Sequence, residues 1–256
     1  MKYIIGNWKM NLATRESLAL VRGVLRALQG KEVVPNVVLC PSFTSLTEVH
    51  KLLTRTRVEL GAQNAGPDRA GAMTGEVGLA QLEDVGCKYA IIGHSERRAQ
   101  FHEDDALIRA RLTAVLASSL TPILCVGEPA DARARNEAVS YVTEQLHAAL
   151  RDQAMPRGKK LVVAYEPIWA IGSGHPATPQ DAVTMHRAIR DVVKQYARLD
   201  GDRVAVVYGG SVEGANAYQF LREAEIDGVL VGGASLRLNE FESILQAATE
   251  VIEAQG

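Results

Sequence analysis

Few features of this 256-residue sequence suit it to an oxidising environment or a metal-centred chemistry. It contains only three cysteines, Cys40, Cys87 and Cys125, without CxxC or cysteine–histidine spacing. An odd number of cysteines in this arrangement predicts neither a disulfide framework nor a zinc site, and it fits a reducing compartment. We therefore expect a cytoplasmic protein without a bound metal.

The sequence also lacks an excess of one charge and a long apolar run. Its formal net charge is −2 and its isoelectric point is about 6.3, so no basic face for nucleic acid is expected. The N-terminus has only a four-residue apolar run, 3–6, before polar residues appear, which fits neither a signal peptide nor a membrane span. The sequence predicts neither a nucleic-acid partner nor a membrane partner.

Short apolar runs alternate with helical patterns eight times along the chain. The expected strands cover 3–6, 37–40, 58–62, 89–92, 122–126, 161–165, 204–208 and 229–231. The expected helices cover 14–28, 45–53, 79–85, 104–118, 136–150, 179–199, 215–224 and 240–252. Such alternation predicts parallel strands joined by crossover helices. Eight repeats at this length favour a closed (β/α)8 barrel of the α/β class, and an open doubly wound sheet is the alternative that the pattern leaves open. Because no linker or low-complexity tract divides the chain, we expect a single domain over residues 1–256.

The stretch 164–174 carries the strongest functional signal. Glu166 stands at the carboxyl end of an expected strand, where an acid has no packing role, and Pro167 ends that strand. Large apolar residues follow in a segment too rich in proline and glycine to be helical. We interpret residues 167–177 as a lid that closes over Glu166 and excludes water. An ordinary strand-to-helix connection with a surface glutamate is the alternative.

Polar and glycine-rich residues also follow other expected strands. In a barrel, the carboxyl ends of all strands meet at the face that carries the chemistry. These groups are Asn7 and Lys9 after the first strand, His94, Ser95 and Glu96 after the fourth, Tyr208 to Ser211 after the seventh, and Gly232 with Gly233 after the eighth. Each group alone has an ordinary explanation as a surface residue or a turn. Their convergence on one face predicts an active site.

These groups fit proton transfer next to a carbonyl. The glycine-rich loops at 209–211 and 232–233 are expected to open short helices whose backbone N–H groups hold a phosphate. We expect Ser95 to cap a helix whose positive end keeps the imidazole of His94 neutral. Glu166, dehydrated beneath the lid, is then a stronger base, and Lys9 supplies positive charge for an enediolate. No cofactor is needed for this chemistry.

Seven strings occur along the chain in the order found in one known family. They are Asn7-Trp8-Lys9-Met10-Asn11, Gly61-Ala62-Gln63-Asn64, Ile92-Gly93-His94-Ser95-Glu96-Arg97-Arg98, Cys125-Val126-Gly127-Glu128, Tyr165-Glu166-Pro167-Ile168-Trp169-Ala170-Ile171-Gly172, Tyr208-Gly209-Gly210-Ser211-Val212 and Leu230-Val231-Gly232-Gly233-Ala234-Ser235. The match runs from residue 3 to about residue 238. With these strings the sequence closely resembles the triosephosphate isomerase family, which has the TIM barrel fold.

The resemblance implies an isomerase of glycolysis and gluconeogenesis that interconverts dihydroxyacetone phosphate and D-glyceraldehyde 3-phosphate. It implies Glu166 as the base, His94 as the neutral electrophile and Lys9 as the electrostatic stabiliser. It also implies substrate binding by Asn7 and Lys9, and phosphate binding by the backbone N–H groups of Gly172, Ser211, Gly232 and Gly233. Ile171 and Leu230 would clamp the base, and Tyr208 and Ser211 would form hydrogen bonds with the closed lid. Ser95 and Glu96 are implied as supporting residues. The loop 63–76 resembles the family's dimer loop, so a homodimer is implied.

Three other functions were weighed against this one. A glycosidase would use two carboxylates, and Glu96 with Glu166 is the available pair, but Glu96 is better placed for an ion pair. An isomerase of a four-carbon ketose phosphate would use the same groups, and a barrel kept only for binding would not need them. The string 172–177 matches a dinucleotide-binding pattern but lies too far from its strand. One departure from the family, His175-Pro176-Ala177, affects the second hinge of the lid.

Overall fold

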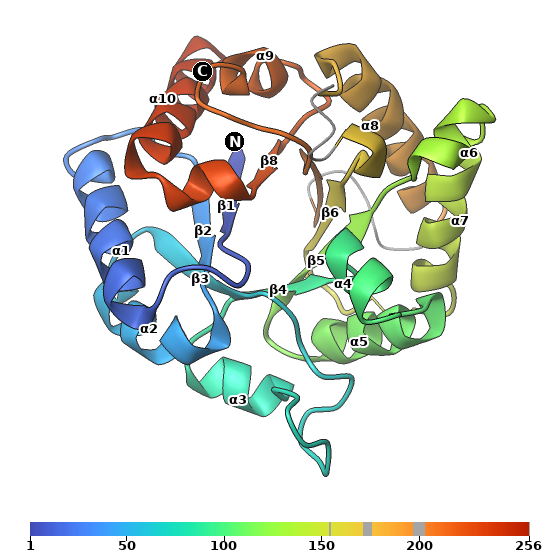
Figure 1. Ribbon diagram of the computed structural model, residues 1–256, viewed down its shortest axis with the longest axis horizontal. Coiled ribbons are helices and arrows are strands. Elements are labelled where there is room, and N and C mark those ends of the chain that lie inside the picture. The colour runs from blue at the N-terminus through green and yellow to red at the C-terminus, as the bar shows by residue number, and fades with distance from the viewer. Residues whose placement is uncertain (154, 171–175, 197–202, 256) are drawn as a thin grey trace.

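The computed structural model describes residues 1–153, 155–170, 176–196 and 203–255. Within these ranges eight parallel strands follow one another in sequence order and close into a barrel, which confirms the predicted (β/α)8 fold (Figure 1). The strands are β1 (Tyr3–Asn7), β2 (Asn36–Cys40), β3 (Val58–Ala62), β4 (Tyr89–Ile92), β5 (Thr121–Val126), β6 (Leu161–Tyr165), β7 (Val204–Tyr208) and β8 (Gly228–Val231). The open sheet that the sequence allowed is excluded, because β1 pairs with both β2 and β8.

Helices form an outer ring around the strands (Figure 1). The α-helices are α1 (Thr14–Leu28), α2 (Leu46–Leu53), α3 (Leu79–Asp84), α4 (Ser95–Gln100), α5 (Asp105–Ala117), α6 (Ala130–Ala134), α7 (Ala138–Leu150), α8 (Pro179–Val193), α9 (Ala217–Leu221) and α10 (Leu238–Gln255). Short 3₁₀ helices are η1 (Phe43–Ser45), η2 (Ile168–Ala170) and η4 (Gly233–Leu236). Among the described residues, no helix is long and apolar enough to cross a membrane.

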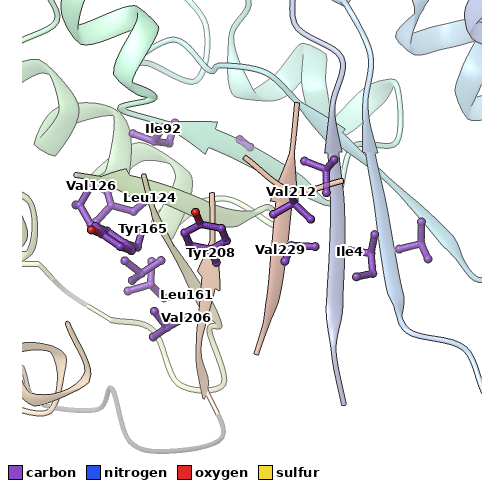
Figure 2. Close-up of a cluster of buried hydrophobic side chains, with 14 of the residues drawn as sticks. Ile4, Ile92, Leu124, Val126, Leu161, Tyr165, Val206, Tyr208, Val212 and Val229 are labelled. Atoms are coloured by element: carbon purple, nitrogen blue, oxygen red, sulfur yellow. The ribbon is translucent and has the colours of Figure 1, made fainter. Parts of the chain in front are cut away.

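Alternate residues of every strand except β3 belong to two separate apolar clusters. In β6, Leu161, Val163 and Tyr165 pack with helix residues, whereas Val162 and Ala164 pack only with other strand residues. Because successive side chains of a strand point to opposite faces, the first cluster joins the strands to the helices and the second fills the barrel interior. Figure 2 shows part of the first cluster, with side chains along neighbouring strands.

This alternation decides which side chains reach the mouth of the barrel. Tyr165 faces the helices, so the next side chain, Glu166, points inward at the carboxyl end of β6. Ile5 belongs to the interior cluster, so Asn7, two residues later, also points inward. Leu230 is an interior residue of β8 at the same end. The fold therefore brings groups from distant parts of the sequence to one face.

Candidate active site

A cavity of about 200 Å³ opens at the carboxyl ends of the strands. Its lining comes from loops after β1, β4, β6, β7 and β8. The lining residues are Asn7, Lys9, His94, Glu166, Gly209, Gly210, Ser211, Val212, Glu213, Leu230, Gly232, Gly233, Ala234 and Arg237. Of the candidates from the sequence that lie in described segments, the structure brings all but Tyr208, Ser95 and Glu96 to this lining. Each of those three contacts or adjoins a lining residue: Ser95 bonds Glu166, Glu96 pairs with Lys9, and Tyr208 directly precedes Gly209.

Glu166 is almost completely buried, with 2% of its surface exposed, and both of its oxygens accept hydrogen bonds. Oε1 lies 3.0 Å from Nε2 of His94, and Oε2 accepts the backbone N–H of Ser95 at 2.9 Å. Burial raises the pKa of Glu166, but the contacts with His94 and Ser95 outweigh it and leave the pKa below its usual value. The sequence suggested a stronger base; in this arrangement the carboxylate is a weaker one, because two donors stabilise its charge.

His94 is the N-cap residue of α4, a position that the sequence analysis wrongly assigned to Ser95. Its Nδ1 accepts the backbone N–H of Glu96 at 3.3 Å, so the ring proton stands on Nε2 and is directed at Glu166. The imidazole thus performs the capping that a serine hydroxyl was expected to perform. Ser95 is the first residue of the helix and contributes its backbone N–H to Glu166.

Opposing influences act on the protonation of His94. Burial lowers the pKa of the ring, and the Glu166 carboxylate raises it above its usual value. The N–H of Glu96 at Nδ1 opposes this rise, because a second ring proton would face that donor. The rise therefore depends on Glu166 remaining in contact with the ring. When the carboxylate moves away, burial and the backbone donor both favour the neutral imidazole.

Lys9 adopts a left-handed backbone conformation, with φ of 52°, which is uncommon for a residue with a side chain. Its N–H donates to Oδ1 of Asn7 at 3.1 Å, and its carbonyl accepts Nε2 of Gln63 at 2.8 Å. Its Nζ lies 2.5 Å from Oε1 of Glu96, the ion pair that the sequence favoured over a glycosidase acid. A Cβ added at Gly232 would lie 3.4 Å from the Lys9 Cε, so the ammonium stem runs along the glycine-rich loop after β8.

The two glycine-rich loops differ from one another. After β8, Gly232 precedes the 3₁₀ helix η4, as expected. After β7, the expected helix at Ser211 is absent: the chain forms a loop, and α9 begins only at Ala217. The Ser211 carbonyl accepts Nδ2 of Asn216 at 3.1 Å, which holds the loop in shape. Both loops line the cavity, so the geometry is compatible with an anion bound between them.

Part of the expected lid lies outside the described residues, including the site candidates Ile171 and Gly172 and the departure at His175. The described start of this segment forms η2, with the Ala170 N–H donating to the Pro167 carbonyl at 2.9 Å. The Tyr208 hydroxyl, expected to bind the closed lid, is buried without a hydrogen-bond partner among the described residues. Its ring stacks on Phe220 with 4.3 Å between centroids.

Sequence reasoning missed several residues that support the site. Gln63 donates to the carbonyls of both Lys9 and Cys40, at 2.8 and 2.9 Å, and joins the ends of β1, β2 and β3. Glu128 is completely buried and accepts hydrogen bonds from Tyr165 and Trp169. Gln63 stands one residue after the end of β3, and Glu128 stands two residues after the end of β5. A polar residue directly after a strand is the same signal that marks Glu166 in the sequence.

Comparisons with known proteins agree on one family. The family model described as triosephosphate isomerase matches residues 2–248. The chain is 41% identical to a triosephosphate isomerase of Rhodopirellula baltica over 96% of both chains. It is 43% identical to that of Thermus thermophilus, with 96% of this chain and 98% of the relative covered. The crystal structure of triosephosphate isomerase from Bartonella henselae superposes with a TM-score of 0.84 at 31% identity, covering 96% of this chain and 98% of that one. The chain therefore belongs to the triosephosphate isomerase family.

Proposed function

We propose that this protein interconverts dihydroxyacetone phosphate and D-glyceraldehyde 3-phosphate by moving a proton between adjacent carbons. The observation that carries the proposal is the pairing of a buried carboxylate, Glu166, with the Nε2–H of His94 at the barrel mouth. A base and a neutral hydrogen-bond donor are the groups that an enediolate mechanism needs.

Glu166 is the proposed base. Its present partners occupy both oxygens, so the carboxylate must leave the Ser95 N–H and the His94 ring to reach a substrate carbon. Losing two donors while remaining buried raises its affinity for a proton. Glu166 then takes a proton from the carbon next to the carbonyl and returns it to the former carbonyl carbon, while the hydroxyl proton passes from the neighbouring oxygen to the former carbonyl oxygen.

His94 is the proposed electrophile. Once Glu166 has moved, its Nε2–H is free to donate to the carbonyl oxygen of the substrate. The Glu96 N–H keeps Nδ1 unprotonated, so the ring polarises the carbonyl as a neutral donor. Ser95 and Glu96 support this arrangement without touching the reacting carbons.

Lys9 is the proposed stabiliser of negative charge on the enediolate and the phosphate. Asn7 fixes the backbone of Lys9 and lines the same cavity. Backbone N–H groups of Ser211, Gly232 and Gly233, with Gly172 from the lid, are the proposed phosphate donors. This proposal is supported by the course of the Lys9 side chain along Gly232.

A lid over residues 167–177 completes the proposal by excluding water from the enediolate. Ile171 and Leu230 would clamp the base, and Leu230 lines the cavity beside Glu166. The Tyr208 hydroxyl, which has no partner among the described residues, and the loop residue Ser211 are the proposed hydrogen-bond partners of the closed lid.

We also propose that two copies of the chain form a homodimer through loop 63–76. Arg111 fixes both ends of this loop, donating to the Ala65 carbonyl at 2.8 Å and to Oε1 of Glu76 at 3.1 Å. Between β3 and α3 the loop extends away from the barrel (Figure 1). Met73 in the loop and Phe101 after α4 are 47% and 62% exposed, which is unusual for large apolar side chains.

The chain is proposed to act as one domain in the cytoplasm. The three cysteines are buried and free, which fits a reducing compartment. Because the barrel strands span residues 3–231, the proposed site draws on nearly the whole chain.

A coupled assay with D-glyceraldehyde 3-phosphate tests the proposed activity. We expect turnover of the triose phosphate to exceed that of a four-carbon ketose phosphate at matched concentrations, because the cavity is small. No turnover of the triose phosphate by the folded protein would refute the proposal. Faster turnover of the four-carbon substrate would instead identify the protein as an isomerase of four-carbon ketose phosphates.

A further inference from the structure

Arg133 of α6 contacts two residues near opposite ends of the connection between β6 and α8: Trp169, soon after β6, and Asp181, in α8. Its guanidinium lies over the ring of Trp169, 3.9 Å from the centroid. Its Nη2 donates to Oδ1 of Asp181 at 2.7 Å. Trp169 follows the base Glu166 by three residues, and Asp181 lies in the first turn of α8. One side chain from a separate element thus bridges the start and the end of this segment.

The Trp169 ring is held along its edge as well as on its face. Its Nε1 donates to Oε1 of Glu128 at 2.7 Å, and the same oxygen accepts the hydroxyl of Tyr165 at 3.0 Å. Tyr165 directly precedes Glu166 in the chain. The buried carboxylate of Glu128 therefore joins the residue before the base to the ring that follows it. The guanidinium of Arg133 lies 3.9 Å from that carboxylate oxygen.

Asp181 in turn fixes the beginning of α8. It is the N3 residue of a capping box, in which its Oδ2 accepts the N–H and the hydroxyl of Thr178 at 2.9 and 2.7 Å. The other oxygen receives Arg133. The first turn of α8 is thereby connected through one guanidinium to the ring beside the base.

We propose that Arg133 is a positioning residue for Glu166, which it acts on through Trp169, Glu128 and Asp181. The inference rests on the proposed function and adds to it a residue outside the active-site cavity. Stacking requires a flat cation, and the bond to Asp181 requires a donor directed away from the ring. Arginine meets both needs at once, whereas lysine meets only the second.

The electrostatics of Glu128 support this role. Burial raises the pKa of Glu128, and the donors Trp169 and Tyr165 together with the charge of Arg133 oppose the rise. The groups that face this carboxylate are Arg133 from α6, Tyr165 from β6 and Trp169 from η2, with Asp181 of α8 held on the far side of Arg133. Removing the cation favours protonation, and a protonated carboxyl is a weaker acceptor for the indole N–H.

The test compares Arg133→Met with Arg135→Met, a matched loss of arginine at the end of the same helix. Arg135 pairs with Asp131 and Glu137 on the surface and touches neither Trp169 nor Asp181 in the structure. We expect Arg133→Met to lower kcat about 3–30-fold, the range of a cation–ring contact, with KM changed less than about twofold. Arg133→Lys should recover part of the loss, and Arg135→Met should match the parent.

Fluorescence gives a readout that does not depend on turnover. The chain has two tryptophans, so Trp8→Phe leaves Trp169 as the only tryptophan, which can be excited selectively over the tyrosines. In that background we expect Arg133→Met to change the Trp169 emission and to shift its titration midpoint to higher pH, as Glu128 gains its proton more readily. Arg135→Met should change neither. If Arg133→Met does not fold, Asp181→Asn makes the same comparison by removing the charge that orients the guanidinium.

Equal kcat losses in the two methionine variants, or Trp169 emission that responds to neither, would overturn the proposal. A loss confined to KM would also overturn it, since it would place Arg133 in substrate binding. If the Trp169 emission responds as expected but the parent does not turn over triose phosphates, the proposed function fails and with it the positioning of a base, and only the coupling of Arg133 to Trp169 is retained.

Discussion

At the scale of single residues, the carboxylate of Glu166 is the group whose removal should cost the most activity. Glu166→Gln keeps the side-chain volume, and its amide oxygen can still accept the Ser95 N–H, so the fold should be retained. An amide cannot take up the proton, and we expect kcat to fall roughly 10²–10⁴-fold. The triose phosphate assay measures the loss, with circular dichroism as the control for folding. Turnover close to that of the parent would rule out Glu166 as the base.

Gly127 fixes the backbone that carries this carboxylate. A Cβ added there would lie 1.8 Å from the carbonyl oxygen of Glu166, which is backbone and cannot rotate away. Gly127→Ala must therefore push β5 and β6 apart at the site, although the Glu166 N–H is bonded to the Val126 carbonyl at 2.8 Å. We expect a loss of about 1–3 kcal/mol in the free energy of unfolding, typical of overpacking, together with reduced kcat.

Urea unfolding and the isomerase assay on Gly127→Ala measure both effects. The two losses are expected together because the same displacement moves the base and breaks strand packing. A variant with parental stability and parental kcat would show that the backbone at the end of β5 and β6 can accommodate the added methyl group without loss of stability or activity.

The meeting of Glu166, His94 and Lys9 at one cavity could be predicted from the sequence, but the pKa shifts of Glu166 and His94 could not. Glu166, His94 and Lys9 were found because each follows a strand that ends at one face. The lowered pKa of Glu166 depends on the Ser95 N–H and the His94 ring, whose distances the sequence does not specify. The backbone of Lys9 likewise depends on Gln63, which meets it only in the fold.

At the scale of elements, α8 carries a buried histidine that should make stability depend on pH. His186 is fully buried, its Nδ1 lies 3.1 Å from the Glu225 carbonyl, and its Nε2 has no partner among the described residues. Burial lowers the pKa of His186 to about 4. Its ordinary value is about 6.5, so between these values the unfolded chain binds a proton that the native chain does not.

Acidification should therefore favour unfolding in this window, and the contribution of His186 is fully present only above about pH 6.5. From about pH 7 to about pH 5 we expect the free energy of unfolding to fall by about 2 kcal/mol on account of this side chain. His186→Gln should flatten that part of the profile in urea unfolding, while His50→Gln, a change outside α8, should not. An unchanged profile in His186→Gln would assign the acid sensitivity to other groups.

The elements themselves were predictable where apolar periodicity was strong. All eight strands and the long helices α1 and α10 lie where the pattern placed them. The errors occur at helix ends and in short helices: His94 takes the capping role expected of Ser95, no helix begins at Ser211, α8 ends at Val193 although 179–199 was expected, and α6 was not expected. A cap is decided by which acceptor reaches the free N–H groups, and an imidazole can serve as well as a hydroxyl.

At the scale of the whole molecule, the count of eight alternations favoured a closed barrel, and the pairing of β1 with β8 confirms the closure. Closure also explains the separation of the core into an interior cluster and a cluster between strands and helices. The oligomeric state was less predictable than the fold, because the length and composition of loop 63–76 indicate only that the loop has a functional contact and not which molecule it contacts. The projection of this loop from the barrel (Figure 1) and its exposed side chain Met73 support a second copy of the chain as the partner.

The last prediction concerns this partner. Hydrogen bonds between Gly66 and Val77, and between Ala80 and Arg69, hold loop 63–76 in shape, so it is ordered before any partner binds. Such a preformed projection with exposed apolar residues suits insertion into an identical copy, since two-fold symmetry then buries two loops at once. Sedimentation at micromolar concentration should give twice the 27.7 kDa chain mass.

Met73→Glu places a charge on the most exposed apolar side chain of the loop and should weaken the dimer at least about tenfold, because burying an unpaired carboxylate is costly. Val139→Glu, a matched change at an exposed apolar residue of α7 far from the loop, should leave the dimer intact (Figure 1). We propose that the loop inserts beside Lys9 and His94 of the other copy, and we therefore expect the isomerase activity of Met73→Glu to fall with the dimer fraction. A parental protein that sediments as a fully active monomer would contradict this proposal, and equal dissociation of both variants would place the interface elsewhere.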